Sequence, residues 1–490
     1  MNFTIFTGYS GFTQRTNNIA ALIKKTYPKS EINTLVFGKD NHNFLINQSY
    51  VSYDDILCIE DLLEYCNKQT YIPSDYEIQQ IEKKLGYNLN YLLHTERIFA
   101  QHTHDLIYQR KLSQAELNKF IFYLAIELEK FIEKSDVVFV YTCASIVSEI
   151  LYFLCKQKNK IHYTIFESRF PQTFFLSKKN YDYLIDDIES FYLKKEITNE
   201  GKSTINKLKL KLNEQNFNPT QAKVISNIHN EKSITAKNIL RFISNLFNNN
   251  LNPHYLAPNK VQRIKINILF QLRKYYVRHF FDKGVPNNQF VYFPLTTSPE
   301  ASTLVRAQKY YDNLGLIKLL AREVPINWKI LVREHPGMIG KRPISFYREL
   351  KSIFNVHLVS DSAKPIECIK QAEAIITITG TSGFESMLLG KKTIVLGNTM
   401  YSELRSVFKV NHLEEIGSIV RKEWSDEDVT NQLNDLEMLA TYFINNKIIK
   451  DNDKLLWSKK SKETIEETEI DRDIFYKLKL NIEKDLNIKE

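Results

Sequence analysis

Five short apolar runs alternate with helical stretches between residues 289 and 396, and this alternation limits the possible folds of the chain more than any other feature. Short apolar strands separated by helices are typical of a parallel sheet covered by helices. The predicted strands are Gln289–Leu295, Lys329–Arg333, Val356–Ser360, Ala374–Thr379 and Lys392–Leu396. The predicted helices lie near Thr303–Glu323, Ser345–Phe354 and Pro365–Gln371, and a fourth begins at about Ser382. We therefore expect a doubly wound, Rossmann-like sheet in this part of the chain.

The first 170 residues show the same alternation, and a length of 490 residues is more than one ordinary domain holds. The predicted strands are Asn2–Thr7, Ile32–Gly38, Val137–Tyr141 and Ile161–Glu167, and the predicted helices are Asn17–Tyr27, Leu117–Lys134 and Ser145–Lys156. The predicted fold class is α/β, with two Rossmann-like domains. We expect them at 1–170 and 286–425, joined by a helical, basic region at 171–285 and followed by a helical tail at 426–490.

Composition and charge exclude several classes of protein. The net charge is +9, from 66 Lys and Arg against 57 Asp and Glu, and both signs are interleaved, so no nucleic-acid partner is expected. The five cysteines form no C-x-x-C pair and no metal-ligand spacing, which favours reduced, buried thiols and predicts no metal site. No signal-peptide pattern opens the chain, and no apolar run approaches the ~20 residues of a membrane span. These features predict a cytoplasmic protein, either soluble or peripheral on the inner face of the membrane.

A basic helix is predicted over residues 259–283. Its cationic side chains stand between Ile, Leu, Phe and Tyr residues: Lys260, Arg263, Lys265, Arg273, Lys274 and Arg278. Such a helix can lie on an anionic bilayer, or it can connect two domains with its charged face in solvent. The sequence leaves both interpretations open.

The first chemical motif is ILVREHPGM, in which a strand ends at Arg333, Glu334, His335 and Pro336. A residue before proline is held in an extended conformation, so His335 should stand at the carboxyl end of its strand. Open α/β sheets bind ligands at that edge. The imidazole can then contact a phosphate, a base or a ribose, or it can simply form a polar cap on a turn.

The second motif is AIITITGTSGFESMLLG, where a strand stops at Gly380-Thr381-Ser382-Gly383 and a helix containing Glu385 follows. The amides at such a helix start, with two hydroxyls beside them, form a phosphate-binding turn. Glu385 can accept hydrogen bonds from sugar hydroxyls, or it can favour the positive end of the helix. The motif has neither the lysine of a Walker loop nor the G-x-G-x-x-G spacing of a dinucleotide site.

Over about residues 289–401 the sequence resembles the capsule polysaccharide biosynthesis family of bacterial glycosyltransferases. The resemblance is carried by YFPLTTSPEASTLVRAQKYYDNLGLIKLLA, LVREHPGMIGKR, FYREL and ITITGTSGFESMLLGKKTIVLG, and more loosely by HTERIFAQHTH and FESRF. That family includes Kdo transferases, and its His-Pro and Ser/Thr elements are similar to those of sialyl- and polysialyltransferases with CMP-activated donors. The resemblance implies a GT-B arrangement, in which two Rossmann-like domains face each other.

The resemblance also implies roles for particular residues. His335 and Pro336 would contact the nucleotide, Thr381 and Ser382 its phosphate, and Glu385 would be the following helix acid. Arg333 stands where the family pattern leads us to expect lysine. The acidic-acidic-glycine element that holds the base in polysialyltransferases has no match, because Glu60-Asp61 is followed by leucine.

A GT-B enzyme binds its donor on the C-terminal sheet, so the catalytic carboxylate is expected in residues 1–170. The candidates are Glu96, Glu167 and Asp105, in that order, although ion pairs of Glu96 with Arg97 and of Glu167 with Arg169 are an alternative. The loop containing Gly8 and Gly11 is either part of the acceptor site or an ordinary turn.

The function predicted from these features is the transfer of a sugar from a nucleotide-activated donor, with CMP-Kdo favoured, to a polysaccharide or glycolipid of the bacterial surface. The nucleotide-sugar is a substrate, and no cofactor is expected. Two alternatives remain: a UDP-sugar transferase or 2-epimerase-like enzyme, and a scaffold for polysaccharide assembly without catalytic activity.

Overall fold

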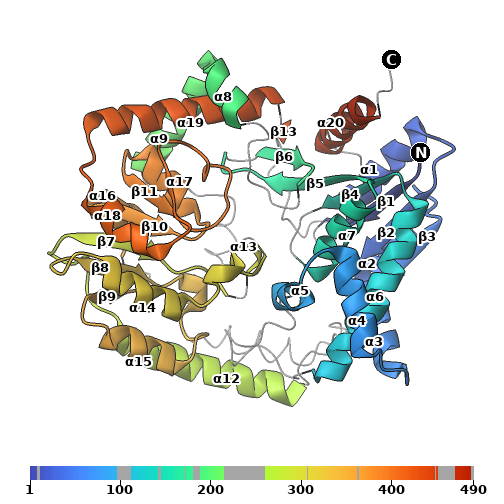
Figure 1. The fold of residues 1–490 in the computed structure, drawn as a ribbon, viewed down its shortest axis with the longest axis horizontal. Coiled ribbons are helices and arrows are strands. Elements are labelled where there is room, and N and C mark those ends of the chain that lie inside the picture. Colours follow the sequence, from blue (N-terminus) through green and yellow to red (C-terminus); the bar gives the residue numbers. More distant parts are fainter. Residues whose placement is uncertain are drawn as a thin grey trace, which may run out of the picture.

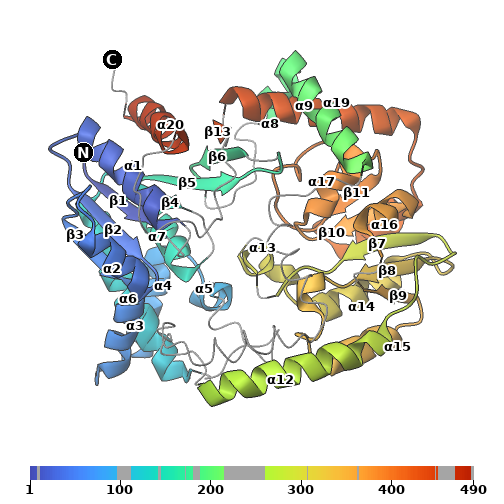
Figure 2. The same cartoon turned by 180° about the vertical axis from the view of Figure 1, so that it is seen from behind.

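The computed structural model describes the chain except residues 8–11, 97–111, 142–144, 171–172, 180–187, 215–259, 299, 306, 361–362, 447–448, 451–468 and 487–490. It contains two sheets, each covered by helices, in two halves that face each other (Figure 1). Figure 2 shows the same two halves from behind.

The first sheet has the strand order β13-β6-β5-β4-β1-β2-β3. Its parallel strands are β1 (Phe3–Phe6), β2 (Ile32–Val36), β3 (Asp55–Cys58), β4 (Val137–Tyr141) and β5 (Ile161–Glu167). The order 3-2-1-4-5 is that of a Rossmann sheet. Two antiparallel strands extend it, because β6 (Thr173–Ser177) pairs with β5 and β13 (Ile449–Lys450) pairs with β6.

Helices bury both faces of this sheet, which explains why its central strands are continuously apolar. In β4, Val138 and Val140 belong to a helix-covered core on one face, while Phe139 belongs to a second core on the opposite face. The helices of this half are α1 (Thr13–Thr26), α2 (Lys39–Asn47), α3 (Ile59–Lys68), α4 (Asp75–Leu85), α5 (Leu89–Thr95), α6 (Gln114–Lys134) and α7 (Ile146–Gln157).

The second sheet has the order β12-β11-β10-β7-β8-β9, and all its pairs are parallel. Read from β9, this is again the Rossmann order. The strands are β7 (Phe290–Pro294), β8 (Lys329–Arg333), β9 (Val356–Val359), β10 (Ala374–Thr377), β11 (Lys392–Val395) and β12 (Phe408–Lys409). The longer helices around it are α14 (Asn313–Glu323), α15 (Ile344–Ser352), α16 (Pro365–Gln371), α17 (Thr381–Leu388) and α18 (Ile416–Arg421). The predicted fold class, two Rossmann-like α/β domains, is confirmed.

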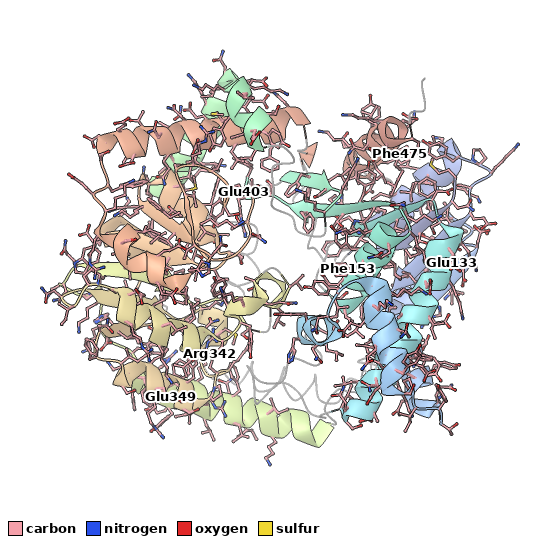
Figure 3. All side chains as sticks on the ribbon, in the orientation of Figure 1. Glu133, Phe153, Arg342, Glu349, Glu403 and Phe475 are labelled. Carbon is pink, nitrogen blue, oxygen red and sulfur yellow. The ribbon has the colours of Figure 1, made fainter. Side chains whose placement is uncertain are left out.

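The remaining segments tie the two halves together. Helices α8 (Ile188–Lys194) and α9 (Asn199–Asn213) pack with α19 (Asp426–Asn446) on the second half, in one core that also contains α17. Helix α20 (Glu469–Asp485) returns to the first half, where its Asp471 accepts a hydrogen bond from Asn18 of α1 at 2.7 Å. Phe475 of α20 is labelled beside that half in Figure 3.

The basic helix α12 (Lys260–Tyr276) continues into the 3₁₀ turn η2 (Val277–Phe280) and lies along the second half. Arg273 of α12 donates to the carbonyl oxygen of Arg342 at 3.2 Å. Among the described helices, none combines the length and apolar composition that crossing a bilayer requires.

Two sequence predictions about the elements were wrong. The helix predicted at Thr303–Glu323 consists of three pieces, α13 (Ala301–Leu304), η3 (Gln308–Tyr310) and α14. Asp312 interrupts it, because its carboxylate accepts from the amides of Leu314 and Gly315 at 3.1 Å and so starts a new helix. The region 171–285, predicted to be helical, also contains β6, whose ladder with β5 lengthens the first sheet.

Candidate functional site

The two motifs lie on either side of the carboxyl end of β7. The chain builds β7, β8 and β9 in one direction and then crosses back to place β10 on the other side of β7. Such a reversal of strand order is where doubly wound sheets bind ligands. The turn after β8 begins with Glu334 and His335, and the turn after β10 leads through Gly380 into α17.

His335 is held in one orientation by its own turn. It is the N-cap of the 3₁₀ turn η4 (Pro336–Met338), with φ −69° and ψ 128°, and Pro336 occupies the first turn position. Its Nδ1 accepts from the amide of Gly337 at 3.1 Å, so the proton of the neutral ring is on Nε2. Burial lowers the pKa of this half-buried imidazole to about 4. At neutral pH, His335 therefore offers one N–H donor at a fixed position.

Glu334 supports this turn from inside the domain. It is fully buried, and its carboxylate accepts from Arg342 Nε at 3.0 Å, from the Tyr347 hydroxyl at 2.9 Å and from the His335 amide at 2.7 Å. Arg342 also donates to the carbonyl oxygen of Thr296, after β7, at 2.6 Å. Figure 3 labels Arg342 in the second half, on the side along which α12 runs. Ligand contact by Glu334, as the motif suggested, conflicts with this burial, and the carboxylate instead joins two loops.

Arg333, the last residue of β8, is half-buried, and its Nε donates to the carbonyl oxygen of Ala363 at 2.7 Å. Its charge acts on both His335 and Glu385. Arg333 thus contributes positive charge between the two turns.

The turn at Gly380 leads into α17, and the amides of Thr381 and Ser382 stand at the start of this helix. The Gly380 amide donates to Thr377 Oγ1 at 3.0 Å, and the Gly383 amide donates to the Gly380 carbonyl at 3.3 Å. The first amides of a helix have no intrahelical acceptor, so those of Thr381 and Ser382 are the donors that a ligand would meet. Thr381 is half-buried and Ser382 is 7% exposed.

The glycines of this turn are needed for contacts within the protein. A Cβ on Gly383 would lie 2.3 Å from the Tyr401 hydroxyl and 2.9 Å from Thr377 Cγ2, and one on Gly380 would lie 2.8 Å from Thr377 Oγ1. A side chain at Gly383 would therefore overlap atoms of the protein itself, whether or not a ligand is bound. The space is already occupied by Tyr401, whose hydroxyl donates to the Gly380 carbonyl at 2.5 Å.

The charges of two arginines, one from each half of the molecule, act on Glu385. Burial raises the pKa of its carboxyl to about 7, although the charges of Arg169 and Arg333 oppose this shift. Arg169 follows β5, and its Nη2 donates to the carbonyl oxygen of Thr379 at 2.9 Å. The sequence prediction missed Arg169 as a site residue. Its only signal in the sequence is the FESRF segment, where an ion pair of Arg169 with Glu167 is the alternative interpretation.

Of the three carboxylates predicted in the first half, Glu96 has a described side chain, and it is enclosed. Glu96 is 1% exposed and accepts from the Ile146 amide at 3.3 Å, at the start of α7. This burial conflicts with a role for Glu96 as the base that meets the acceptor. Glu167 ends β5 opposite Phe174, but its side chain is outside the described part of the structure. Asp105, Gly8 and Gly11 also lie outside the described residues.

The described residues include one group of potential metal ligands, His42, Cys58 and Asp61, whose ligand atoms lie within 4.8 Å of one another. Burial raises the pKa of the Cys58 thiol to about 11, which disfavours the thiolate that a metal would bind. Asp61 already lies 3.5 Å from the Lys39 ammonium and 3.7 Å from His42. An ion-pair cluster accounts for this group.

The family comparison covers the part of the chain that carries both turns. Residues 211–415 match the family described as "Capsule polysaccharide biosynthesis protein". The matched segment makes up less than half of the 490 residues. The match confirms the resemblance seen in the sequence, and it includes the whole second sheet from β7 to β12.

Curated relatives match a shorter stretch. The "Capsule polysaccharide modification protein LipA" of Neisseria meningitidis serogroup B is 26% identical over 109 residues, which is 22% of this chain. The LipA protein of serogroup A gives the same values. The aligned stretch spans only 15% of the length of these relatives.

Solved structures give weak overall superpositions. A "beta Kdo 2,7 transferase", KpsC of Thermosulfurimonas dismutans, is 12% identical with a TM-score of 0.31, covering 61% of this chain and 81% of its own. The UDP-GlcNAc 2-epimerase of Neisseria meningitidis is 11% identical with a TM-score of 0.27, covering 91% and 99%. At these scores neither likeness carries an argument, and the fold assignment rests on the strand order of the two sheets.

Proposed function

We propose that this protein is a glycosyltransferase of capsule polysaccharide biosynthesis and that it binds a nucleotide-activated sugar at the carboxyl ends of β7, β8 and β10. The observation that carries the proposal is the pair of turns on either side of β7. His335 Nε2–H lies in one turn, and the amides of Thr381 and Ser382 lie in the other. Both turns belong to the segment that matches the capsule polysaccharide biosynthesis family.

The proposed chemistry at these turns is the binding and release of a phosphate. Departure of the nucleotide leaves negative charge on the phosphate, and fixed N–H donors stabilise such charge well in a partly buried site. The start of α17 supplies amides and the positive end of the helix dipole, and His335 supplies a neutral donor. Arg169 and Arg333 add positive charge close to Glu385.

Glu385 is proposed to contact the sugar of the donor. It is half-buried, and its pKa near 7 allows the carboxyl to accept or to donate a proton at physiological pH. The acceptor, a polysaccharide or glycolipid of the bacterial surface, would approach from the first half. Of the three carboxylates predicted there, Glu167 and Asp105 remain candidates for the base, because Glu96 is enclosed.

CMP-Kdo is the favoured donor, because the sequence resemblance extends to Kdo transferases and to enzymes with CMP-activated donors. A cytoplasmic location at an anionic membrane surface is part of the same proposal. Helix α12 supports it through the exposed side chains of Ile268, Leu272 and Tyr275, with Lys265 and Arg278 exposed near them. Apolar and basic side chains on one exposed helix suit the boundary of an anionic bilayer.

The experiment that tests the function combines ligand binding with turnover. The full chain is titrated with CMP and with UDP by calorimetry, and it is then assayed for sugar transfer from CMP-Kdo to a capsular glycan acceptor. CMP binding that is weakened in His335→Ala but not in Lys318→Gln, an exposed residue of α14, supports the proposal. Preferential binding of UDP would favour a UDP-sugar transferase or a 2-epimerase. Nucleotide binding with no turnover of either donor class would favour a scaffold.

A further inference from the structure

A cavity lies away from the strand-end turns. It has a volume of about 800 Å³, within the range of about 300–1,000 Å³ typical of ligand sites. Its walls come from β5 and β6 of the first sheet, from α8 and α19, and from α20. Figure 1 shows these elements together at the top of the molecule, and Figure 2 shows the same grouping from behind. No residue of the β8 or β10 turn lines it.

Four lysines and two carboxylates line this cavity. The lysines are Lys178, Lys194, Lys477 and Lys484, and the acids are Glu196 and Asp485. Asp485 accepts from Lys178 and from the Tyr163 hydroxyl, and Glu196 accepts from Asn445 Nδ2 at 3.0 Å. Both acids are therefore engaged.

Within the described part of the chain, Lys194, Lys477 and Lys484 have neither a hydrogen bond nor an ion pair. Burial lowers the pKa of the half-buried Lys477, and Asp473 is the only group that opposes this shift. A partly dehydrated ammonium without a partner loses hydration energy that an anionic ligand can restore.

The remaining lining suits a ligand that carries both hydroxyl groups and apolar surface. Tyr442, Phe191 and Met438 supply aromatic and apolar wall, while Asn481 supplies an amide that can both donate and accept. A small inorganic anion would leave most of this volume and wall uncontacted.

We propose that this cavity binds a segment of an acidic oligosaccharide, with its carboxylates on Lys194, Lys477 and Lys484. The proposal rests on the proposed function, because it gives the protein a second contact with the glycan that it elongates or modifies. The cavity is built from both halves of the chain, so a glycan bound here would contact both at once. The cavity would hold a part of the glycan that is remote from the reacting sugar.

The test measures binding of a defined probe to the full chain by calorimetry. The probe is an oligomer of galacturonic acid, which carries one carboxylate per sugar, and an uncharged galactose oligomer of equal length is the control. We expect the acidic oligomer alone to bind. Lys194→Gln combined with Lys477→Gln should weaken it roughly tenfold or more, because hydrogen bonds to charged groups contribute strongly. Lys29→Gln, an exposed lysine outside the cavity, should leave it unchanged.

Three results would overturn the proposal: equal binding of both oligomers, unchanged affinity in the double variant, or binding of inorganic phosphate as tight as that of the acidic oligomer. Binding of CMP to each variant is measured in parallel and should be unaffected, which also shows that the variants are folded. Failure of the proposed function has a different signature. It would abolish the response to His335→Ala in the CMP titration and leave binding of the acidic oligomer intact.

Discussion

Arg169 and Thr379 are joined by a hydrogen bond of 2.9 Å between a guanidinium at the end of β5 and a carbonyl oxygen after β10. The two residues belong to different halves, so the bond crosses from the first sheet to the turn that begins α17. The Arg169 amide also lies 3.1 Å from Met400 Sδ. The environment of Glu385 therefore depends on how the two halves are held together.

Replacement of Arg169 tests this dependence. We expect Arg169→Gln to raise the pKa of Glu385 further, because one of the two cations that oppose its shift is removed. The measurement is the pH dependence of the rate of sugar transfer. The change in rate near pH 7, which reports the titration of Glu385, should move to higher pH. Arg169→Lys keeps the charge and should move this change in rate less. Identical profiles for all three proteins would separate Glu385 from the reaction.

His335 is expected to donate through Nε2. His335→Ala should weaken nucleotide binding roughly tenfold, the scale of a hydrogen bond to a charged group, without unfolding the domain. His335→Gln can place an amide N–H near the same point and should recover part of the affinity. Calorimetric titration with CMP gives both values. Equal affinity of wild type and His335→Ala would show that the imidazole only caps its turn.

The unusual pKa values of Glu385 and His335 predict opposite effects of pH on stability. The raised pKa of Glu385 contributes stability that is present below pH 4.5 and is lost as pH rises to about 7. The lowered pKa of His335 contributes stability that is present above pH 6.5 and is lost as pH falls to about 4.

Urea unfolding across this pH range compares each variant with the wild type. Glu385→Gln should gain stability as pH rises from 4.5 to 7, by at most about 3 kcal/mol. His335→Gln should gain stability relative to the wild type as pH falls from 6.5 to 4. A difference from wild type that stays constant with pH in either variant would contradict the corresponding shift.

The Glu334–Arg342 pair should be costly to break. Arg342→Leu leaves the buried Glu334 carboxylate without its cation, and loss of one partner of a buried pair costs about 3–5 kcal/mol. The matched control is Lys318→Leu, which breaks an exposed pair with Glu349 and should cost about 0–1 kcal/mol. Thermal unfolding of both variants checks the difference. Similar losses would mean that Tyr347 and the His335 amide satisfy Glu334 without Arg342.

Gly383 should tolerate no side chain while Tyr401 is present. Gly383→Ala should cost about 1–3 kcal/mol, because the new Cβ would overlap the Tyr401 hydroxyl. In the background of Tyr401→Phe the same change should cost less, since the overlapping oxygen is gone. The double-mutant cycle is measured by urea unfolding. An unchanged cost in the Phe background would place the constraint elsewhere.

The sequence predicted the interior of both sheets better than their edges. Strands β4, β5 and β8 and helix α16 have the predicted bounds. Strand β4 is buried on both faces and is a continuous apolar run, and Pro365 marks the start of α16. Strands β3, β6, β12 and β13 were not predicted. They are short and lie at or near the sheet edges, where pairing with a distant segment decides whether a strand forms.

The same contrast holds for the site. The turns at His335 and Gly380 could be placed because local residues, Pro336 and the glycines, specify them. Arg169 could not, because its position depends on contact between the two halves. Glu96 stood in a polar stretch of sequence, but its environment is set by the amide of Ile146, which is far along the chain.

The return of α20 to the first half has a consequence for the order in which the protein can fold during its synthesis. Ile474, Leu478 and Ile482 of α20 complete the core that Ile19 and Ile23 of α1 begin. Domains usually fold as they leave the ribosome, starting from the N-terminus. Here the part of this core that α20 covers stays exposed until translation has passed residue 482, so the nascent first half presents apolar surface while the whole second half is made.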